Sequence, residues 1–127
     1  MYPHSFVTEK AMADYDMSSG VGRTYRYYKG TPLFPFGWGL SLTEFDLSCR
    51  RPEAAETKYS CIVRNMGDVA GDEVVLVYHA ADSIGAVRHP VPRRSLVDFA
   101  RVSLAAGEES LLAFDISPEQ LKLVDEK

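Results

Sequence analysis

The stretch EVVLVYHA, residues 73–80, decides the fold class of this 127-residue chain. Its length and its run of valines with a tyrosine are typical of a β-strand. In an extended backbone Val75 and Val77 lie on one face, and Val74, Leu76 and Tyr78 lie on the other. Because both faces are apolar, we predict a strand that is buried on both sides.

Further strand-like segments lie before and after residues 73–80. Phe45 and Leu47 alternate with polar residues, Lys58 to Asn65 places Cys61 and Val63 on one face, and the same alternation recurs further along. The other two expected strands are Ala100–Leu104, with Val102 and Leu104 facing inward, and Ser110–Ile116, with Leu112, Phe114 and Ile116 facing inward.

Turn residues separate these segments at short intervals. Residues 65–68 (Asn-Met-Gly-Asp) and 105–108 (Ala-Ala-Gly-Glu) are turns by residue type. Residues 117–120 (Ser-Pro-Glu-Gln) form a capping box with proline at the first helical position, which predicts a short helical turn or a further strand. Strands at this spacing predict an all-β fold, a β-sandwich.

The segment before residue 43 differs in character. Residues 22–41 (GRTYRYYKGTPLFPFGWGLS) concentrate aromatic residues among glycines and prolines. The segment is too apolar for a linker and too interrupted for a helix. We therefore predict two extended pieces around a turn at Lys29-Gly30, followed by a tight loop. Residues 1–20 show no clean period, and Ala11–Met17 is either a short strand or an irregular arm.

Aromatic and arginine side chains of this arm are the candidate binding residues. The rings can stack on sugar faces, and the guanidinium groups can bind hydroxyls or a carboxylate. The alternative, which interface composition favours, is that they hold a neighbouring domain. The candidates are Arg23, Tyr25, Arg26, Tyr27, Tyr28 and Trp38.

The composition and charge of the chain argue against several classes of function. A hydrophobic fraction of 46% and a charged fraction of 25% are ordinary for a soluble domain. A net charge of −4 with interspersed signs argues against nucleic acid as the main partner. The longest apolar run, residues 74–77, is too short to cross a membrane. The first five residues also lack the basic and apolar stretches of a signal peptide.

No catalytic residue, cofactor site or metal site is predicted. The acidic pairs are Asp14 with Asp16, Glu44 with Asp46, and Asp72 with Glu73, and each is expected to be a surface or turn pair. Asp68 and Asp72 supply too few oxygen ligands for Ca²⁺.

The two cysteines, Cys49 and Cys61, flank a predicted turn. Two buried thiols acting as small hydrophobic side chains are the favoured interpretation. A bridge between adjacent strands is the alternative, if the two Cβ atoms face each other.

The chain also carries a family resemblance. Residues 22–41 resemble the end of the second catalytic-region domain of glycoside hydrolase family 3, the β-xylosidases and β-glucosidases. The stretch YPHSF, residues 2–6, is more similar to the xylosidase branch. Blocks that resemble the following fibronectin-III-like module occur in the same order, at residues 65–75, at 95–104 with Gly107 and Glu108, and at 118–126.

This resemblance implies a division of the chain. Residues 1–42 would be an aromatic connector at the tail of the preceding α/β hydrolase domain, and 43–127 a fibronectin-III/immunoglobulin-like β-sandwich without its last strand or strands. Unpaired edges and the exposed arm would then favour association. Family members place Tyr or His where Trp38 stands and commonly Tyr where Leu42 stands, so hydroxyl-mediated contacts are not expected there.

The function that the resemblance implies is structural. The catalytic Asp and the acid/base Glu of the family would precede residue 1, so the chain would be a non-catalytic module of a β-glycosidase that needs no cofactor. Its partners would be the upstream hydrolase domains, with a β-linked oligosaccharide as a further candidate. Enzymes of this type are often secreted. A stand-alone carbohydrate- or protein-binding module and a pure spacer are the alternatives.

Overall fold

The computed structural model of the chain describes residues 1–50, 57–80 and 90–122. It divides into two compact units. Of the described residues, unit 1 comprises 1–38, 78–80 and 90–95, and unit 2 comprises 39–50, 57–77 and 96–122. In the described ranges no helix is long and apolar enough to cross a bilayer.

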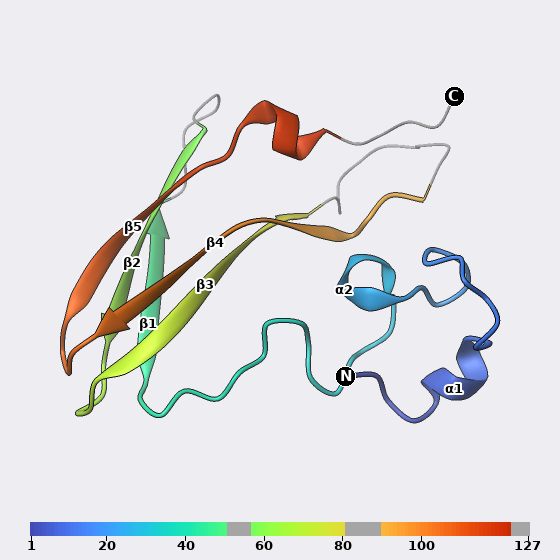
Figure 1. Cartoon of the computed structure of the whole chain (residues 1–127), viewed down its shortest axis with the longest axis horizontal. Helices are drawn as coiled ribbons and strands as arrows, with labels where there is room; N and C mark the ends of the chain where they lie inside the picture. The colour runs from blue at the N-terminus through green and yellow to red at the C-terminus, as the bar shows by residue number, and fades with distance from the viewer. Residues whose placement is uncertain (51–56, 81–89, 123–127) are drawn as a thin grey trace. The chain divides into compact units, whose positions relative to one another are not determined.

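Strands dominate the described chain (Figure 1). β1 (Phe45–Arg50), β2 (Lys58–Asn65) and β5 (Glu109–Asp115) form one sheet in the order β1-β2-β5, and both pairings are antiparallel. A second sheet pairs β3 (Gly71–Ala80) with β4 (Arg94–Leu104). The short helices α1 (Phe6–Glu9) and α2 (Thr24–Tyr27) precede the strands, and the 3₁₀ helix η1 (Pro118–Leu121) follows them.

The core of unit 2 lies between the two sheets. Its buried members come from β2, β3, β4 and β5 and from the residue after β5, and they are Cys61, Val63, Val75, Leu104, Phe114 and Ile116. Because both sheets contribute inward-facing side chains to one cluster, unit 2 is a β-sandwich, as the strand spacing predicted. The predicted inward positions of β2, β4 and β5 are confirmed.

The two-sided burial expected for residues 73–80 is wrong in part. Val75 is 7% exposed, whereas Val74 is 45% exposed. A sandwich covers only the inner face of each sheet, so an outward-facing valine stays in contact with water.

Asn65, at the end of β2, is the most buried polar residue described, with no exposed surface. Its Nδ2 donates to the carbonyls of Val69 (2.7 Å) and Leu104 (3.3 Å). Its Oδ1 accepts from the Thr43 hydroxyl (2.8 Å) and the Gly67 amide (3.1 Å). The amide therefore satisfies the backbone of the turn predicted at residues 65–68 and joins it to the end of β4.

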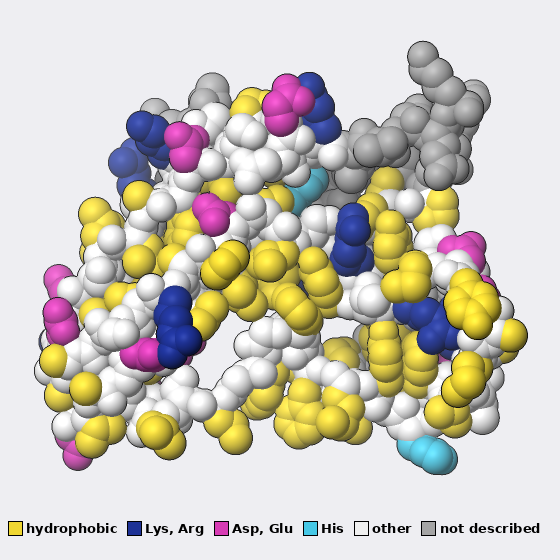
Figure 2. All heavy atoms as spheres, in the orientation of Figure 1, with side chains coloured by type: hydrophobic (Ala, Val, Ile, Leu, Met, Phe, Trp, Pro, Cys, Tyr) yellow, Lys and Arg dark blue, Asp and Glu magenta, His cyan; other side chains and the backbone are white. Residues whose placement is uncertain are grey.

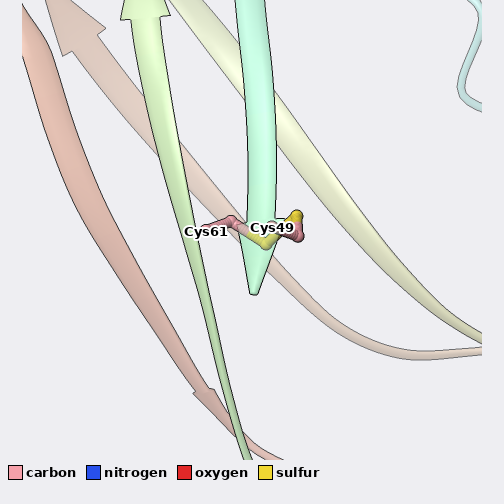
Figure 3. The surroundings of a disulfide bond; sticks show 2 residues. All are labelled: Cys49 and Cys61. Carbon is pink, nitrogen blue, oxygen red and sulfur yellow. A yellow bond between two sulfur atoms is a disulfide. The ribbon is translucent and has the colours of Figure 1, made fainter. Parts of the chain in front are cut away.

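The expectation of two buried thiols is wrong, because Cys49 and Cys61 form a disulfide (Figure 3). The register of β1 and β2 places them directly opposite each other. Cys61 is buried, whereas Cys49 is exposed to solvent. Among the described residues, β1 pairs with β2 alone, so the bond fixes an edge strand to the sheet.

The extended piece predicted before the turn at Lys29-Gly30 is wrong in part, because Thr24–Tyr27 form one helical turn, α2. Its closing bond runs from the Tyr28 amide to the Thr24 carbonyl at 2.9 Å. Gly22 turns the chain into α2 at φ +76°, where a Cβ would lie 2.2 Å from the Tyr27 carbonyl oxygen. One turn needs only a few residues free of proline, and residues 24–27 provide them.

Two local predictions are confirmed. Trp38 donates from its amide to the Pro35 carbonyl at 3.1 Å with Gly37 at φ +85°, which is the expected tight loop. At the other end, Pro118 begins η1, and the Ser117 amide donates to Gln120 Oε1 at 2.8 Å.

Candidate binding cleft

Unit 1 contains a cleft of roughly 770 Å³. Its aromatic walls come from the N-terminal segment, from α2, from the loop after it and from the end of β3. These rings are Tyr2, Tyr25, Tyr28, Phe34, Phe36 and Tyr78. Arg93 and Arg94, at the start of β4, supply its charged side chains. A volume of this size with apolar walls and few polar groups is typical of sites for small molecules.

One wall is a compact group of three rings. Tyr25 stacks on Phe36 with centroids 4.4 Å apart and planes 18° apart. Tyr78 meets both rings edge-on, at 5.8 Å from Tyr25 and 6.4 Å from Phe36. We call these three rings the Tyr25 wall. They come from three separate segments of the chain and have flat aromatic faces.

The Tyr78 hydroxyl in this wall is buried and bonds to no described residue. Burial raises the pKa of Tyr78, the nearby Tyr25 adds to the effect, and Arg94 opposes it. The phenol is therefore neutral at physiological pH.

A second group of rings contributes Tyr2 and Tyr28 to the cleft lining. Tyr2 stacks on Phe6 at 3.9 Å, and Tyr28 meets the two rings edge-on at 5.0 and 5.6 Å. Tyr28 is 8% exposed, and burial raises its pKa, with Glu9 and then Tyr2 as smaller causes. Gly30 fits against this ring only because it has no side chain, since a Cβ there would lie 2.4 Å from the Tyr28 hydroxyl.

Thr24 lies between these groups in a strained conformation. Its φ is +59°, in a region that β-branched residues rarely adopt. Its amide donates to the Tyr2 hydroxyl. The N-terminal segment and α2 are therefore joined by this hydrogen bond to the strained Thr24 as well as by ring contacts.

The six predicted residues do not all meet. Tyr25 and Tyr28 line the cleft. Arg23 is not part of the described cleft lining. It donates to the Ala11 carbonyl at 2.9 Å, and its guanidinium lies 5.7 Å from the centroid of the Phe6 ring. Arg26 covers its neighbour Tyr27 at 5.8 Å. Trp38 is 62% exposed, and its ring is 6.1 Å from that of Phe34.

The sequence interpretation missed Arg93. Its amide donates to the Arg26 carbonyl at 2.7 Å, and its Nη1 donates to the Tyr28 carbonyl at 3.1 Å. These bonds bring residue 93 against α2 across 65 positions of sequence. The adjacent basic pair at 93 and 94 was a visible signal, but nothing local connected it with the aromatic arm.

Two of the three acidic pairs have structural partners. Asp14 bonds to Lys10 and Ser19, and Asp16 caps the Ser18 amide at 2.8 Å. Asp72 pairs with Arg101, and Glu73 accepts from the Ser41 hydroxyl at 2.9 Å. Within the described ranges, no three acidic, histidine or cysteine residues are placed to hold a metal ion.

Comparison with known proteins agrees with this architecture. Residues 73–127 match the family model for a fibronectin type III-like domain. The chain is 38% identical over 129 residues to an exo-1,4-β-xylosidase, bxlB, of Emericella nidulans, covering 86% of this chain and 16% of that enzyme. It is 37% identical over 113 residues to the β-glucosidase BoGH3A of Bacteroides ovatus, covering 81% of this chain and 15% of that enzyme.

A solved structure extends the likeness to three dimensions. A mutant β-glucosidase from Listeria innocua in complex with laminaribiose matches with a TM-score of 0.62 at 32% identity. The match covers 70% of this chain and 13% of that one. The chain thus spans about one sixth of the length of the curated relatives it matches.

Proposed function

This chain is homologous to the C-terminal region of the glycoside hydrolase family 3 β-xylosidases and β-glucosidases, and from this premise we propose that it is a non-catalytic structural module of such an enzyme. The proposal rests on how unequally the alignment covers this chain and its relative. The alignment takes in 86% of this chain but only 16% of the xylosidase. The enzyme of which it forms part would break down β-linked oligosaccharides.

The ionisation of three aspartates in the described part of the chain supports this role. Glycoside hydrolysis uses two carboxyl groups about 5–10 Å apart across the scissile bond, one of them kept protonated. Asp14, Asp16 and Asp72 instead have lowered pKa values, because neighbouring donors stabilise the carboxylate. None of the three would hold a proton at neutral pH.

The partner that we propose is the upstream hydrolase part of the same polypeptide. Residues 1–42 would be the connector to it, and 43–127 the fibronectin-III-like module. Exposed large side chains in and just after the arm suit such a contact, because interfaces are rich in aromatic and apolar groups. They include Leu33, Phe34, Phe36, Trp38, Leu40 and Leu42.

Two assays test this role. The purified chain should release nitrophenol from nitrophenyl xyloside or glucoside no faster than a heat-denatured sample. Added in trans, it should raise the melting temperature of a family 3 β-xylosidase truncated where the alignment begins. Hydrolysis above the denatured control, or no stabilisation of the truncated enzyme, would contradict the proposal.

A second candidate function is carbohydrate binding by the chain itself, favoured by the cleft and its Tyr25 wall. Titration with xylo-oligosaccharides, followed by the fluorescence of the single tryptophan, Trp38, tests it. Trp38 contacts Phe34, which lines the cleft. An unchanged spectrum together with no heat of binding in calorimetry at millimolar sugar would rule this candidate out.

A further inference from the structure

The charged residues in the described lining of the cleft are all basic. The chain has 18 acidic against 14 basic residues. Yet the described lining of the cleft includes Arg93 and Arg94 and no aspartate or glutamate. A cavity lined by one sign of charge focuses its field on a ligand of the opposite sign. The cleft of an acidic chain is therefore suited to an anionic ligand.

The two arginines are held differently. Arg93 is anchored, since its amide bonds to Arg26 and its Nη1 to the Tyr28 carbonyl. Arg94 is exposed, and no residue in the described part of the chain forms an ion pair or hydrogen bond with its guanidinium. A guanidinium has five N–H donors and binds a carboxylate through two of them at once.

The neutral part of the site complements the charged part. Stacked Tyr25 and Phe36, with Tyr78 edge-on, offer apolar ring faces in the same cleft as the arginines. Tyr2 and Tyr28, which also carry hydroxyl groups, are among the other lining residues. An apolar face, scattered hydroxyls and a basic rim match a sugar chain that carries an acid group.

We propose that this cleft binds a β-linked oligosaccharide bearing a carboxylate, such as a uronic acid substituent. Arg94, supported by Arg93, pairs with the carboxylate, and the Tyr25 wall stacks on a neighbouring neutral sugar. The inference rests on the carbohydrate role proposed above and adds to it the chemical class of the ligand.

Calorimetric titration of the full chain tests the proposal. The probes are neutral xylotetraose and the same tetraose carrying one glucuronic acid. We expect the acidic probe to bind roughly tenfold more tightly, because only its carboxylate can form charge-assisted hydrogen bonds with the Arg94 guanidinium. The preference should shrink at 0.5 M salt, because salt screens exposed charges.

Variants assign the effect to residues. Arg94→Gln should reduce the affinity for the acidic probe to that for the neutral one. Tyr25→Ala should weaken both probes alike. Arg64→Gln is the matched control, since Arg64 is an exposed arginine on β2 in unit 2, and it should change neither affinity. Circular dichroism of each variant checks that it is folded.

The outcomes separate the two proposals. Equal binding of the two probes, or an acid preference that survives Arg94→Gln, would refute the carboxylate site and leave carbohydrate binding in place. Absence of binding by both probes would refute the site and the carbohydrate-binding candidate. Neither result bears on the proposed structural role, which the trans-stabilisation assay tests. Competition by free glucuronate or inorganic phosphate with the same affinity would show a general anion site and would also refute the proposal.

Discussion

A single amide at Asn65 organises one end of the sandwich. Its two N–H groups and its oxygen bond to four partners, and two of them, Val69 and Leu104, are acceptors that an aspartate cannot satisfy. Buried polar groups left without partners cost about 1–3 kcal/mol each. The stability of unit 2 should therefore depend on the chemistry of this side chain and not only on its size.

Asn65→Asp is expected to lower the free energy of unfolding at pH 7 by about 3 kcal/mol, because two carbonyls lose their donor and a carboxylate is buried beside them. Urea unfolding followed by circular dichroism measures the change. Gln120→Glu is the matched control, since the exposed Gln120 also donates to a carbonyl, that of Val97 (3.1 Å). It should cost no more than about 0.5 kcal/mol. Equal effects at the two sites would contradict this account.

A buried ammonium group organises unit 1 in a similar way. The Lys10 side chain is 2% exposed, and its Nζ donates to Asp14 Oδ2 (2.6 Å), to the Asp16 carbonyl (2.7 Å) and to Ser19. The hydrogen bond from Lys10, followed by that from Ser19, lowers the pKa of Asp14 from 3.8 to about 2. Because the folded pKa is depressed, this stabilisation is present above about pH 4 and is lost as the pH falls toward 2.

The Lys10 network predicts a pH titration. Carbon-detected NMR should give Asp14 a midpoint near pH 2, and Lys10→Met should move it back toward 3.8. Asp16 is an internal control, since hydrogen bonds from Ser18 are the main cause of its lowered pKa. It should change much less in the variant. An ordinary pKa for Asp14 in the unsubstituted chain would refute the role given to Lys10.

At the scale of elements, the disulfide determines how firmly β1 is held. Cys49 and Cys61 are separated by 12 residues, and in the described chain β1 has a partner strand only on the β2 side. A cross-link acts mainly by restricting the unfolded chain, and a loop of this length corresponds to about 3 kcal/mol. The bond is therefore expected to contribute a sizeable part of the stability of the sandwich.

Reduction of the bond should thus lower the free energy of unfolding by about 3 kcal/mol. Denaturant unfolding with and without dithiothreitol measures the difference, and alkylation with mass spectrometry confirms the thiol state. The double variant Cys49→Ala with Cys61→Ala should show no response to reductant. A fully reduced sample as stable as the oxidised one would show that the bond does not hold β1.

Considered as a whole, the described chain exposes several large apolar side chains between residues 36 and 42. Leu40 is 93% exposed and Leu42 is 96% exposed, and Phe36 and Trp38 are each more than half exposed. On the face drawn in Figure 2, hydrophobic side chains are widely visible. Extended apolar surface of this kind marks an interaction region or promotes aggregation.

We therefore expect concentration-dependent association of the isolated chain in static light scattering. Leu40→Ser with Leu42→Ser should shift it toward the monomer. A matched pair on the sheets, Leu111→Ser with Val74→Ser, replaces side chains that are 67% and 45% exposed and should have little effect. A clean monomer over a wide concentration range would contradict the interaction role of this segment.

Much of the fold was predictable because strands leave a local signal. The alternation in residues 58–65 predicted the bounds of β2 and the burial of Cys61 and Val63, and both are confirmed. Glycine, asparagine and proline likewise marked the turns near residues 37, 67 and 118. A repeat of two residues and a turn residue each act within a few positions, so the sequence alone suffices to recognise them.

Contacts between residues that are far apart in the sequence became evident only in the three-dimensional structure. It paired Cys49 with Cys61, enclosed Asn65 in the backbone of two strands, and placed Arg93 against Tyr28. It also separated Trp38 and Arg23 from the cleft that Tyr25 and Tyr28 line. Such contacts depend on how strands register and how loops close across tens of residues. That arrangement follows from packing the chain as a whole, so local periodicity carries no record of it.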